Sequence, residues 1–263
     1  MCRLFGLYAN RLVNVEFSFF EAARSLEYLS TLNPSGWGIA WFNGKEWRLH
    51  REPIALYESR RARECVRAVR GLIIVSHVRL ATRGEERVEN THPWLYRGRY
   101  VFAHNGSLDR ETLLELLLPE YRDLEGETDS EVLFHLVVQE TESTGDFTEG
   151  VRRAVKKIRS AGVRFNSLNF VASDSVNLYA LRYAKSNLDY YTLYYLERPR
   201  EALYLEKLSE KTAQLIRVKL ARGEKALIVA SEPLTEEDWL EIPNKHLLVV
   251  NRNLKTKLVK ISY

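Results

Sequence analysis

The spacing of apolar residues divides this chain into helices and strands. Phe20, Ala23, Leu26 and Leu29 recur at every third position, which predicts an amphipathic helix over 17–29. Related patterns predict further helices over 58–70, 110–118, 129–140 and 147–160. The pair Asn43-Gly44 separates apolar runs at 37–42 and 47–50. This pair predicts a β-hairpin, because it supplies the positive φ angles that a tight turn needs.

Short apolar runs before and after these helices predict strands. The run over 72–79 is nearly continuous, which indicates a strand buried on both faces. The other predicted strands cover 3–8, 100–104, 169–172, 178–183, 190–196, 202–205, 215–220, 226–230, 246–251 and 258–263. A short helix is predicted over 235–239 with Thr235 as its N-cap. This order of elements predicts an α+β protein whose antiparallel sheets are covered by helices.

Length and composition favour one continuous domain over 1–263. The chain has 263 residues, of which 45% are hydrophobic, and it contains no repeat or Gly/Ser-rich linker. The net charge is +4, and the basic clusters at 60–63 and 152–157 lie in predicted helices, where a solvated face is favoured over a nucleic-acid patch. High Arg, Glu, Lys and Tyr content with one Met and two Gln resembles thermophile usage.

The cellular location of the protein is predicted from features that the sequence lacks. It has no apolar run of about 18 residues, so no membrane span is expected. Glu16 and Glu21 flank the first apolar stretch and no small-residue cleavage site follows, so no signal peptide is expected. Cys2 and Cys65 make no disulfide framework. We therefore expect a cytoplasmic protein with reduced cysteines.

Position 2 holds a cysteine directly behind the initiator methionine. Removal of Met1 would leave Cys2 with a thiol and a free α-amino group on one residue. Such an amine can serve as the base for its own side-chain nucleophile. Its pKa of roughly 7.7–8.0 lies close to the value of about 8.5 for a free thiol, so proton exchange between them is nearly balanced. Cysteine also occurs at this position by chance, so the neighbouring motifs decide its meaning.

Two predicted strands end in residues that suit ligand binding. Arg79 ends the apolar strand over 72–79. It either snorkels to water or clamps a carboxylate with its planar guanidinium. Asn105-Gly106 follows the strand over 100–104. This pair either makes a tight turn or forms an oxyanion hole from the Asn105 amide and the Gly106 N–H group.

The segment Thr128-Asp129-Ser130-Glu131 fits a helix capping box. Thr128 would be the N-cap and Glu131 would occupy the third helical position. Asp129 in the first turn would interact favourably with the helix dipole. The box explains Thr128 and Glu131, and it leaves Asp129 able to turn inward and hold an ammonium group.

Six segments together resemble the class II glutamine amidotransferase domain, one of the N-terminal nucleophile hydrolases. They are Met1-Cys2, Gly36-Trp37-Gly38, Arg79-Leu80-Ala81-Thr82, Asn90-Thr91-His92-Pro93, His104-Asn105-Gly106 and Thr128-Asp129-Ser130-Glu131. The resemblance covers nearly the whole chain and follows the family's order of segments. It implies a four-layer αββα sandwich of two antiparallel sheets and hydrolysis of the γ-amide of glutamine through a γ-glutamyl thioester.

The same resemblance implies roles for individual residues. Cys2 would be the nucleophile, with its α-amine as base. Asn105 and Gly106 would form the oxyanion hole, Arg79 would bind the α-carboxylate of the substrate and Asp129 its α-ammonium group. Thr82 and His92 would line the pocket, whereas Trp37 would brace it. Arg83 stands where many relatives have histidine, so its role is open.

No cofactor and no metal are expected, since His77, His92 and His104 do not follow a metal-ligand pattern. The expected substrate is glutamine, with ammonia either released or delivered to a separate synthase chain. A second hypothesis is a γ-glutamyl amide hydrolase acting on a larger substrate, as in the ergothioneine pathway. A third is a non-catalytic subunit that binds glutamine or a partner. Neither a nucleic acid nor a membrane is an expected partner, and an oligomer is compatible with the sequence.

Overall fold

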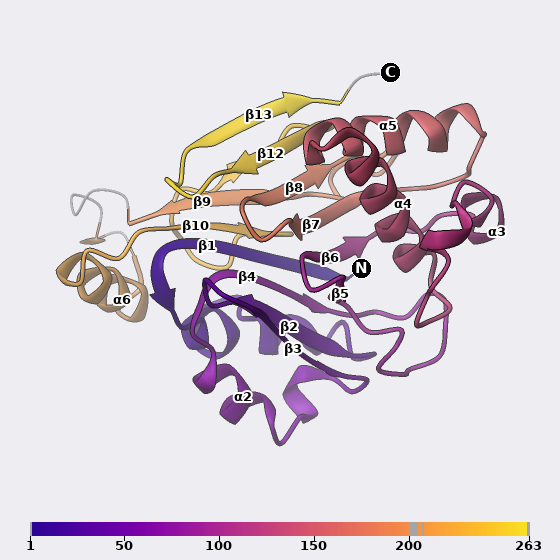
Figure 1. Cartoon of the computed structure of the whole chain (residues 1–263). Helices are drawn as coiled ribbons and strands as arrows, with labels where there is room; N and C mark the ends of the chain where they lie inside the picture. The colour runs from indigo at the N-terminus through magenta and orange to yellow at the C-terminus, as the bar shows by residue number, and fades with distance from the viewer. Residues whose placement is uncertain (1, 200–204, 207, 262–263) are drawn as a thin grey trace.

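The computed structural model describes residues 2–199, 205–206 and 208–261, and it contains two antiparallel sheets (Figure 1). The first sheet has seven strands in the order β11 (Leu240–Glu241), β9 (Tyr194–Arg198), β10 (Ala226–Ala230), β1 (Arg3–Val13), β4 (Gly71–Val78), β2 (Trp37–Phe42) and β3 (Trp47–Glu52). The second has six in the order β13 (Thr256–Lys260), β12 (His246–Val250), β8 (Leu178–Arg182), β7 (Asn169–Ser173), β6 (Tyr100–Asn105) and β5 (Trp94–Tyr96).

Helices cover the outer face of each sheet, as Figure 1 shows for α2 on one side and α4 and α5 on the other. The seven-stranded sheet packs against η1 (Phe17–Glu21), α1 (Leu26–Ser30), η2 (Leu56–Glu58) and α2 (Ala62–Ala68). The six-stranded sheet packs against α3 (Arg110–Leu114), η3 (Pro119–Tyr121), α4 (Asp129–Thr144) and α5 (Phe147–Ser160). A third apolar cluster lies between the two sheets. The predicted four-layer αββα sandwich is therefore confirmed.

Strand alternation decides which side chains enter the space between the sheets. Leu4 and Tyr8 of β1 belong to the inter-sheet cluster, whereas Phe5 and Leu7 belong to the outer one. Because successive side chains of a strand point to opposite faces, Cys2 lies on the same side as Leu4. On β6, Val101 and Ala103 face inward, so Asn105 does too. The nucleophile candidate and the amide candidate thus approach each other from opposite sheets.

The predicted helix over 17–29 is wrong, because the chain is interrupted at its middle. A π-helical turn spans Phe17–Glu21 and α1 begins only at Leu26. Between them Ala22 is extended, with a ψ of 148°. Ser25 then caps α1, since its side chain accepts a hydrogen bond from the Tyr28 N–H at 3.2 Å. A side-chain oxygen that competes for backbone N–H groups favours a new helix start over continuation.

The segment over 215–220 was predicted as a strand but lies inside α6 (Glu210–Ala221). Ser209 caps this helix, and Thr212, Ala213 and Ile216 form its buried side at helical spacing. The predicted helix over 235–239 is also wrong. Thr235 does not cap it; its hydroxyl group contacts the Glu237 carboxylate at 2.8 Å and the Trp239 indole nitrogen at 3.2 Å. Local side-chain contacts replace the expected helical turn.

Several predicted elements differ only at their ends. The strand over 3–8 extends to Val13, whereas the helices over 58–70 and 110–118 shorten to Ala62–Ala68 and Arg110–Leu114. The strand over 190–196 begins at Tyr194, and the residues before it form a turn. Of the predicted strand over 202–205, only Leu205 is among the described residues, and it lies in a short helical turn.

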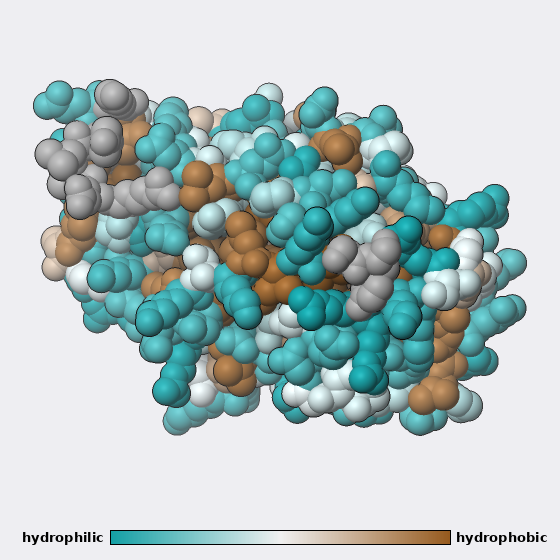
Figure 2. Space-filling model, turned by 90° about the horizontal axis from the view of Figure 1, so that it is seen from above, coloured by the Kyte–Doolittle hydropathy of each residue, from teal (hydrophilic) through white to brown (hydrophobic). Residues whose placement is uncertain are grey.

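The face seen from above in Figure 2 is mainly hydrophilic, with an apolar strip across its middle. This face carries β13, the edge strand of the six-stranded sheet. Leu258 of β13 is exposed, and Lys257 and Lys260 flank it on the same strand. Lysine on an edge strand opposes pairing with another chain. Among the described helices, none combines the length and apolarity needed to cross a membrane.

Candidate active site

Cys2 lies at the start of the central strand β1, partly buried beside Leu80. Its Sγ atom is 3.2 Å from the backbone nitrogen of Leu80 and 3.4 Å from the Leu80 carbonyl oxygen. Burial raises the pKa of the Cys2 thiol, and the hydrogen bond with the Leu80 backbone and the charge of Arg79 oppose that rise. The thiol therefore needs a base in order to react near neutral pH.

A cavity of about 110 Å³ opens at Cys2. Its lining consists of Cys2, Leu80, Thr82, Asn105, Gly106, Ser107, Asn166, Tyr190 and Tyr191. Four of the seven predicted site residues therefore line this cavity. Arg79, His92 and Asp129 are not among the lining residues, although Arg79 directly precedes Leu80, which is.

Asn105 presents an unpaired donor at this cavity. Its side chain is buried, and the amide nitrogen Nδ2 has no hydrogen-bond partner in the described structure. A buried amide without a partner costs about 1–3 kcal/mol, so such a group points to a ligand that completes its bonding. Gly106 follows at the end of β6, where a Cβ atom would lie 1.9 Å from the Ser167 carbonyl oxygen. Only glycine fits this close backbone approach.

Arg79 holds the loop that follows it. Its guanidinium group donates hydrogen bonds to the carbonyl oxygens of Arg83 at 2.7 Å, Glu85 at 3.2 Å and Gly84 at 3.3 Å. The side chain is only 2% exposed. In this arrangement both terminal nitrogens of the guanidinium group, Nη1 and Nη2, donate to backbone carbonyls. Any substrate carboxylate that Arg79 binds must replace some of these contacts.

Arg83 belongs to a second cavity of about 290 Å³ beside the first. This cavity is lined by Arg83, Ser107, Leu108, Asp109, Arg164, Phe165 and Asn166. Ser107 and Asn166 line both cavities, and the Asn166 side-chain oxygen accepts a hydrogen bond from the Ser107 N–H at 2.8 Å. The two cavities are therefore neighbouring parts of one site.

Asp129 is the first residue of α4 and is buried. Its Oδ2 atom accepts a hydrogen bond from the Leu108 N–H at 2.5 Å, which ties α4 to the chain after Gly106. The Thr128 hydroxyl caps α4 by accepting from the Glu131 N–H at 3.3 Å. Glu131 does not complete the predicted capping box, because its carboxylate accepts from the Glu125 and Gly126 N–H groups instead.

His92 lies in a buried aromatic cluster. Its ring centroid is 4.1 Å from those of His77 and Trp94. None of the four ring nitrogens of His77 and His92 has a hydrogen-bond partner among the described residues. Burial lowers the pKa of His77 to about 3 and lowers that of His92 well below its usual value. Both rings are therefore neutral at physiological pH.

Five residues of the cavity were not predicted from the sequence. They are Leu80, Ser107, Asn166, Tyr190 and Tyr191. Leu80 and Ser107 adjoin predicted site residues, so proximity along the chain could have indicated them. Asn166 and the two tyrosines carry no local signal, since only the packing of the sheets brings them to Cys2.

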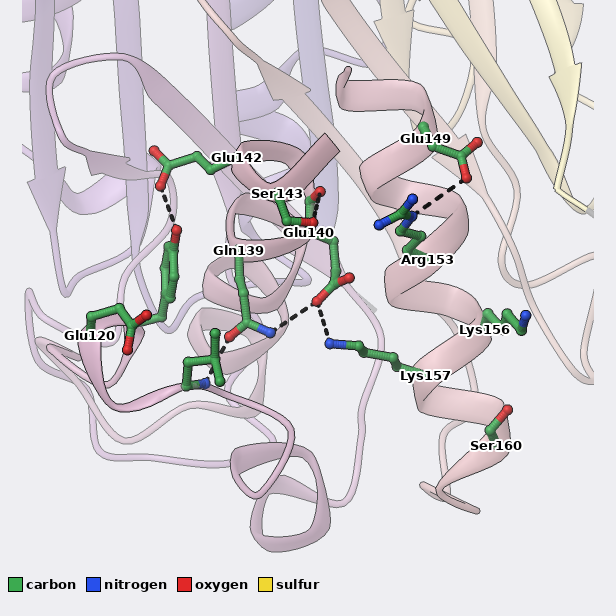
Figure 3. A pocket seen from close by; sticks show the side chains of 12 residues that line it. Glu120, Gln139, Glu140, Glu142, Ser143, Glu149, Arg153, Lys156, Lys157 and Ser160 are labelled. Atoms are coloured by element: carbon green, nitrogen blue, oxygen red, sulfur yellow. Dashed lines mark hydrogen bonds and ion pairs between the residues drawn. The ribbon is translucent and has the colours of Figure 1, made fainter. Parts of the chain in front are cut away.

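A larger cavity, of about 950 Å³, lies between η3, α4 and α5 (Figure 3). Several of its charged side chains already have partners. Glu140 contacts Lys157 at 2.6 Å and Gln139 at 2.9 Å, and Glu142 accepts a hydrogen bond from the Tyr121 hydroxyl at 2.6 Å. Cys2 does not line it. Of these two cavities, the one at Cys2 is the better candidate for chemistry, because it combines a thiol with an unpaired amide donor.

Comparison with known proteins shows relatives that match most of this chain. The chain is 33% identical over 258 residues to an uncharacterised protein of Methanocaldococcus jannaschii, a match covering 95% of this chain and 69% of that one. It is 28% identical to the Escherichia coli K12 protein YafJ, covering 92% and 94% of the two chains. A glutamine aminotransferase class-II domain protein from Silicibacter pomeroyi has the same fold, with a TM-score of 0.67, 21% identity and full coverage of both chains.

The family described as "Glutamine amidotransferases class-II" matches residues 1–261. A match of this extent includes Cys2, both sheets and every segment of the cavity described above. The chain belongs to the class II glutamine amidotransferases.

Proposed function

We propose that this protein hydrolyses the γ-amide of glutamine through a thioester on Cys2. The observation that carries the proposal is the cavity in which the Cys2 thiol and the unpaired Asn105 amide nitrogen meet. A thiol needs an electrophilic carbon, and an unpaired buried donor suits the negative oxygen that forms when that carbon is attacked. A carboxamide supplies both groups.

The reaction would proceed in two stages. After removal of Met1, the Cys2 α-amine takes the thiol proton and the sulfur attacks the amide carbon. Asn105 Nδ2 and the Gly106 N–H group stabilise the resulting oxyanion. The C–N bond then breaks, the α-ammonium group returns the proton to the departing nitrogen and ammonia leaves. Water attacks the thioester to release glutamate and regenerate the thiol.

The charged residues around the cavity would anchor the amino-acid end of glutamine. Asp129 lies beside Leu108, which lines the neighbouring cavity. A carboxylate there suits an α-ammonium group. Arg79 and Thr82 lie on the other bordering segment, where a guanidinium group and a hydroxyl suit the α-carboxylate. Binding of glutamine would exchange some Arg79 contacts to the 83–85 carbonyls for contacts to the substrate.

The test begins with mass spectrometry to establish that Met1 has been removed. Glutamate and ammonia are then measured after incubation with glutamine. We expect equal amounts of both products from the parent and none from Cys2→Ala. Cys65→Ala is the matched control, because Cys65 lies on α2 and packs against the outer face of the seven-stranded sheet, away from the space between the sheets. Burial raises its pKa to about 11.

A glutamine-analogue electrophile provides an independent readout. It should attach once per chain, at Cys2, and leave Cys65 unmodified. Labelling mainly at Cys65, or undiminished hydrolysis by Cys2→Ala, would refute the assignment of the nucleophile. A trimmed parent that turns over neither glutamine nor any other γ-glutamyl compound would favour a binding subunit.

A further inference from the structure

Tyr191 lines the catalytic cavity with its side chain buried. Among the described residues its hydroxyl group has no hydrogen-bond partner. Tyr190 packs against it edge to face, with ring centroids 5.1 Å apart, and is half exposed at the cavity. A phenolic hydroxyl can donate and accept hydrogen bonds. Tyr191 thus adds an unused polar group to the small space that contains Cys2 and Asn105.

Buried polar side chains hold this tyrosine in place. Arg182 donates from Nε to the Tyr191 carbonyl oxygen at 3.0 Å, and from its two other nitrogens to the carbonyl oxygens of Leu188 at 2.9 Å and Ile242 at 2.8 Å. Asn169 donates to the same Tyr191 carbonyl at 3.2 Å. Asn169 is also the cross-strand partner of Asn105. The backbone of Tyr191 is therefore fixed relative to the amide donor of the site.

The two ends of the site differ in composition. One end continues into the second cavity past Ser107 and Asn166, toward Leu108, whose N–H group bonds Asp129. The tyrosines line the first cavity alone. If the amino-acid end of the substrate lies toward Asp129, the departing nitrogen lies toward Tyr191.

We propose that Tyr191 is a specificity-determining residue that selects primary γ-amides, and that Arg182 is a positioning residue acting through it. This inference rests on the proposed function. A primary amide nitrogen carries two N–H groups, and the Tyr191 oxygen accepts one of them. A substituted amide has lost one N–H group and adds bulk where the Tyr191 ring lies. Tyr191 forms part of the wall of the cavity of about 110 Å³, so a bulky amine at the departing nitrogen would meet its ring, whereas ammonia would not.

Substituted amides would be rejected because they cannot make the hydrogen bond that the Tyr191 oxygen accepts. A site built to hydrogen-bond a substrate N–H group discriminates strongly against an analogue that lacks it. The substrate class named here is thus glutamine and close primary-amide analogues. Larger γ-glutamyl amides, the substrates of the rival hydrolase hypothesis, are excluded by the same wall.

The experiment compares kcat/KM for L-glutamine and for γ-glutamyl-p-nitroanilide, a bulky substituted amide. Tyr191→Phe removes only the hydroxyl group and should lower kcat/KM for glutamine by about threefold to tenfold, the effect of one net hydrogen bond. Tyr191→Ala should raise the anilide-to-glutamine ratio by about tenfold or more. Tyr183→Phe is the control, because Tyr183 is buried but does not line the cavity.

Arg182→Lys keeps a positive charge and removes the three-way contact with the loop carbonyls. It should shift the anilide-to-glutamine ratio in the same direction as Tyr191→Ala, whereas a purely structural role would lower both activities equally. A parent that prefers the anilide, or Tyr191 variants with unchanged ratios in an active enzyme, would overturn the inference and leave the proposed function standing.

A readout that needs no turnover separates the two proposals further. Alkylation of Cys2 by a bulky maleimide, relative to iodoacetamide, should accelerate in Tyr191→Ala because the wall beside the thiol has been removed. Unchanged relative rates would overturn the placement of Tyr191 even if no substrate is found. A parent with a free Cys2 terminus that hydrolyses no γ-glutamyl compound would instead refute the proposed function and the selectivity assigned here.

Discussion

Acidification should destabilise this protein through His77, a fully buried residue of β4. Burial is the main cause that lowers its pKa to about 3, and the charges of Arg79 and of a protonated His104 act in the same direction. A contact with the His104 backbone opposes the shift, but no hydrogen bond of normal geometry reaches either ring nitrogen. We expect His77→Phe to remove part of the pH dependence of stability.

The magnitude follows from linkage. The pKa of His77 is lower in the folded state, about 3, than in the unfolded state, about 6.5. The unfolded chain therefore takes up the proton first as pH falls. The stabilising effect of the neutral ring is complete above about 6.5 and is lost progressively between 6.5 and 3. At pH 5 the unfolded residue is almost fully protonated and the folded one is neutral, which costs about 2 kcal/mol.

This loss of stability at pH 5 depends little on the pKa of His77 in the folded state, because any value well below 5 leaves the folded residue neutral at that pH. The assay is urea unfolding of parent and His77→Phe at pH 7.5 and pH 5.0. The free energy of unfolding of the parent should fall by about 2 kcal/mol more than that of the variant.

His77→Leu serves as a second variant that lacks the aromatic ring, and it should show the same reduced pH dependence as His77→Phe. Other titrating groups are common to all three proteins. Burial, the largest cause of the low pKa of His92, is kept in the variants, so these groups largely cancel in the comparison. Equal losses of stability in parent and variants would show that folded His77 gains a proton as easily as unfolded His77, and the argument from burial would then fail.

Three further substitutions test the site. Asn105→Asp replaces the unpaired donor by a carboxylate of the same shape and should lower kcat for glutamine by about 10²–10³, measured as glutamate release. Gly106→Ala places a methyl group 1.9 Å from the Ser167 carbonyl oxygen, so the thermal unfolding midpoint should fall sharply. Arg79→Lys keeps the charge but loses the fork that bonds the 83–85 carbonyls, so KM for glutamine should rise, and an unchanged KM would remove Arg79 from the binding site.

The sequence predicted those parts of the fold that depend on local pattern. The apolar run over 72–79 and the hairpin around Asn43-Gly44 became strands at nearly the predicted positions. The run over 215–220 did not, because six apolar-rich residues fit a strand or one side of a helix equally well, and Ser209 decides in favour of the helix. The break before α1 depends on one capping residue, Ser25. The apolar residues continue at three-residue spacing across this break, so the spacing alone predicted an unbroken helix.

The candidate site likewise contains residues that motifs predicted and residues that only the packing of the sheets brings together. Asn105 and Gly106 meet Cys2 at one cavity, as their motifs indicated. A motif does not reveal which hydrogen bonds a side chain already makes, and both terminal nitrogens of Arg79 bond the carbonyls of its own loop. Tyr191 lies 189 positions from Cys2 along the chain, in a segment predicted as a strand. Its place depends on the packing of two sheets and on the Arg182 contacts, which no short sequence pattern encodes.

The position of β1 explains how Cys2, although it is the second residue of the chain, is held at a fixed place, as the proposed nucleophile must be. The first residues of most domains are poorly ordered, and a mobile thiol would not remain within reach of the Asn105 amide. Here β1 lies in the middle of the seven-stranded sheet, between β10 and β4. Leu4 donates its N–H group to the Ser231 hydroxyl at 2.9 Å and accepts from the Ser231 N–H group at 3.1 Å.

Arg3 adds an ion pair with Glu232, which also contacts Arg24 at 2.5 Å. The residues immediately after Cys2 are thus fixed by ladder bonds on both sides and by the segment after β10. Side chains alternate between the two faces of such a fixed strand. Because Leu4 points into the space between the sheets, the Cys2 thiol, two positions earlier, points there as well. The central place of β1 in the sandwich is therefore also what brings the Cys2 sulfur to the cavity that we propose as the active site.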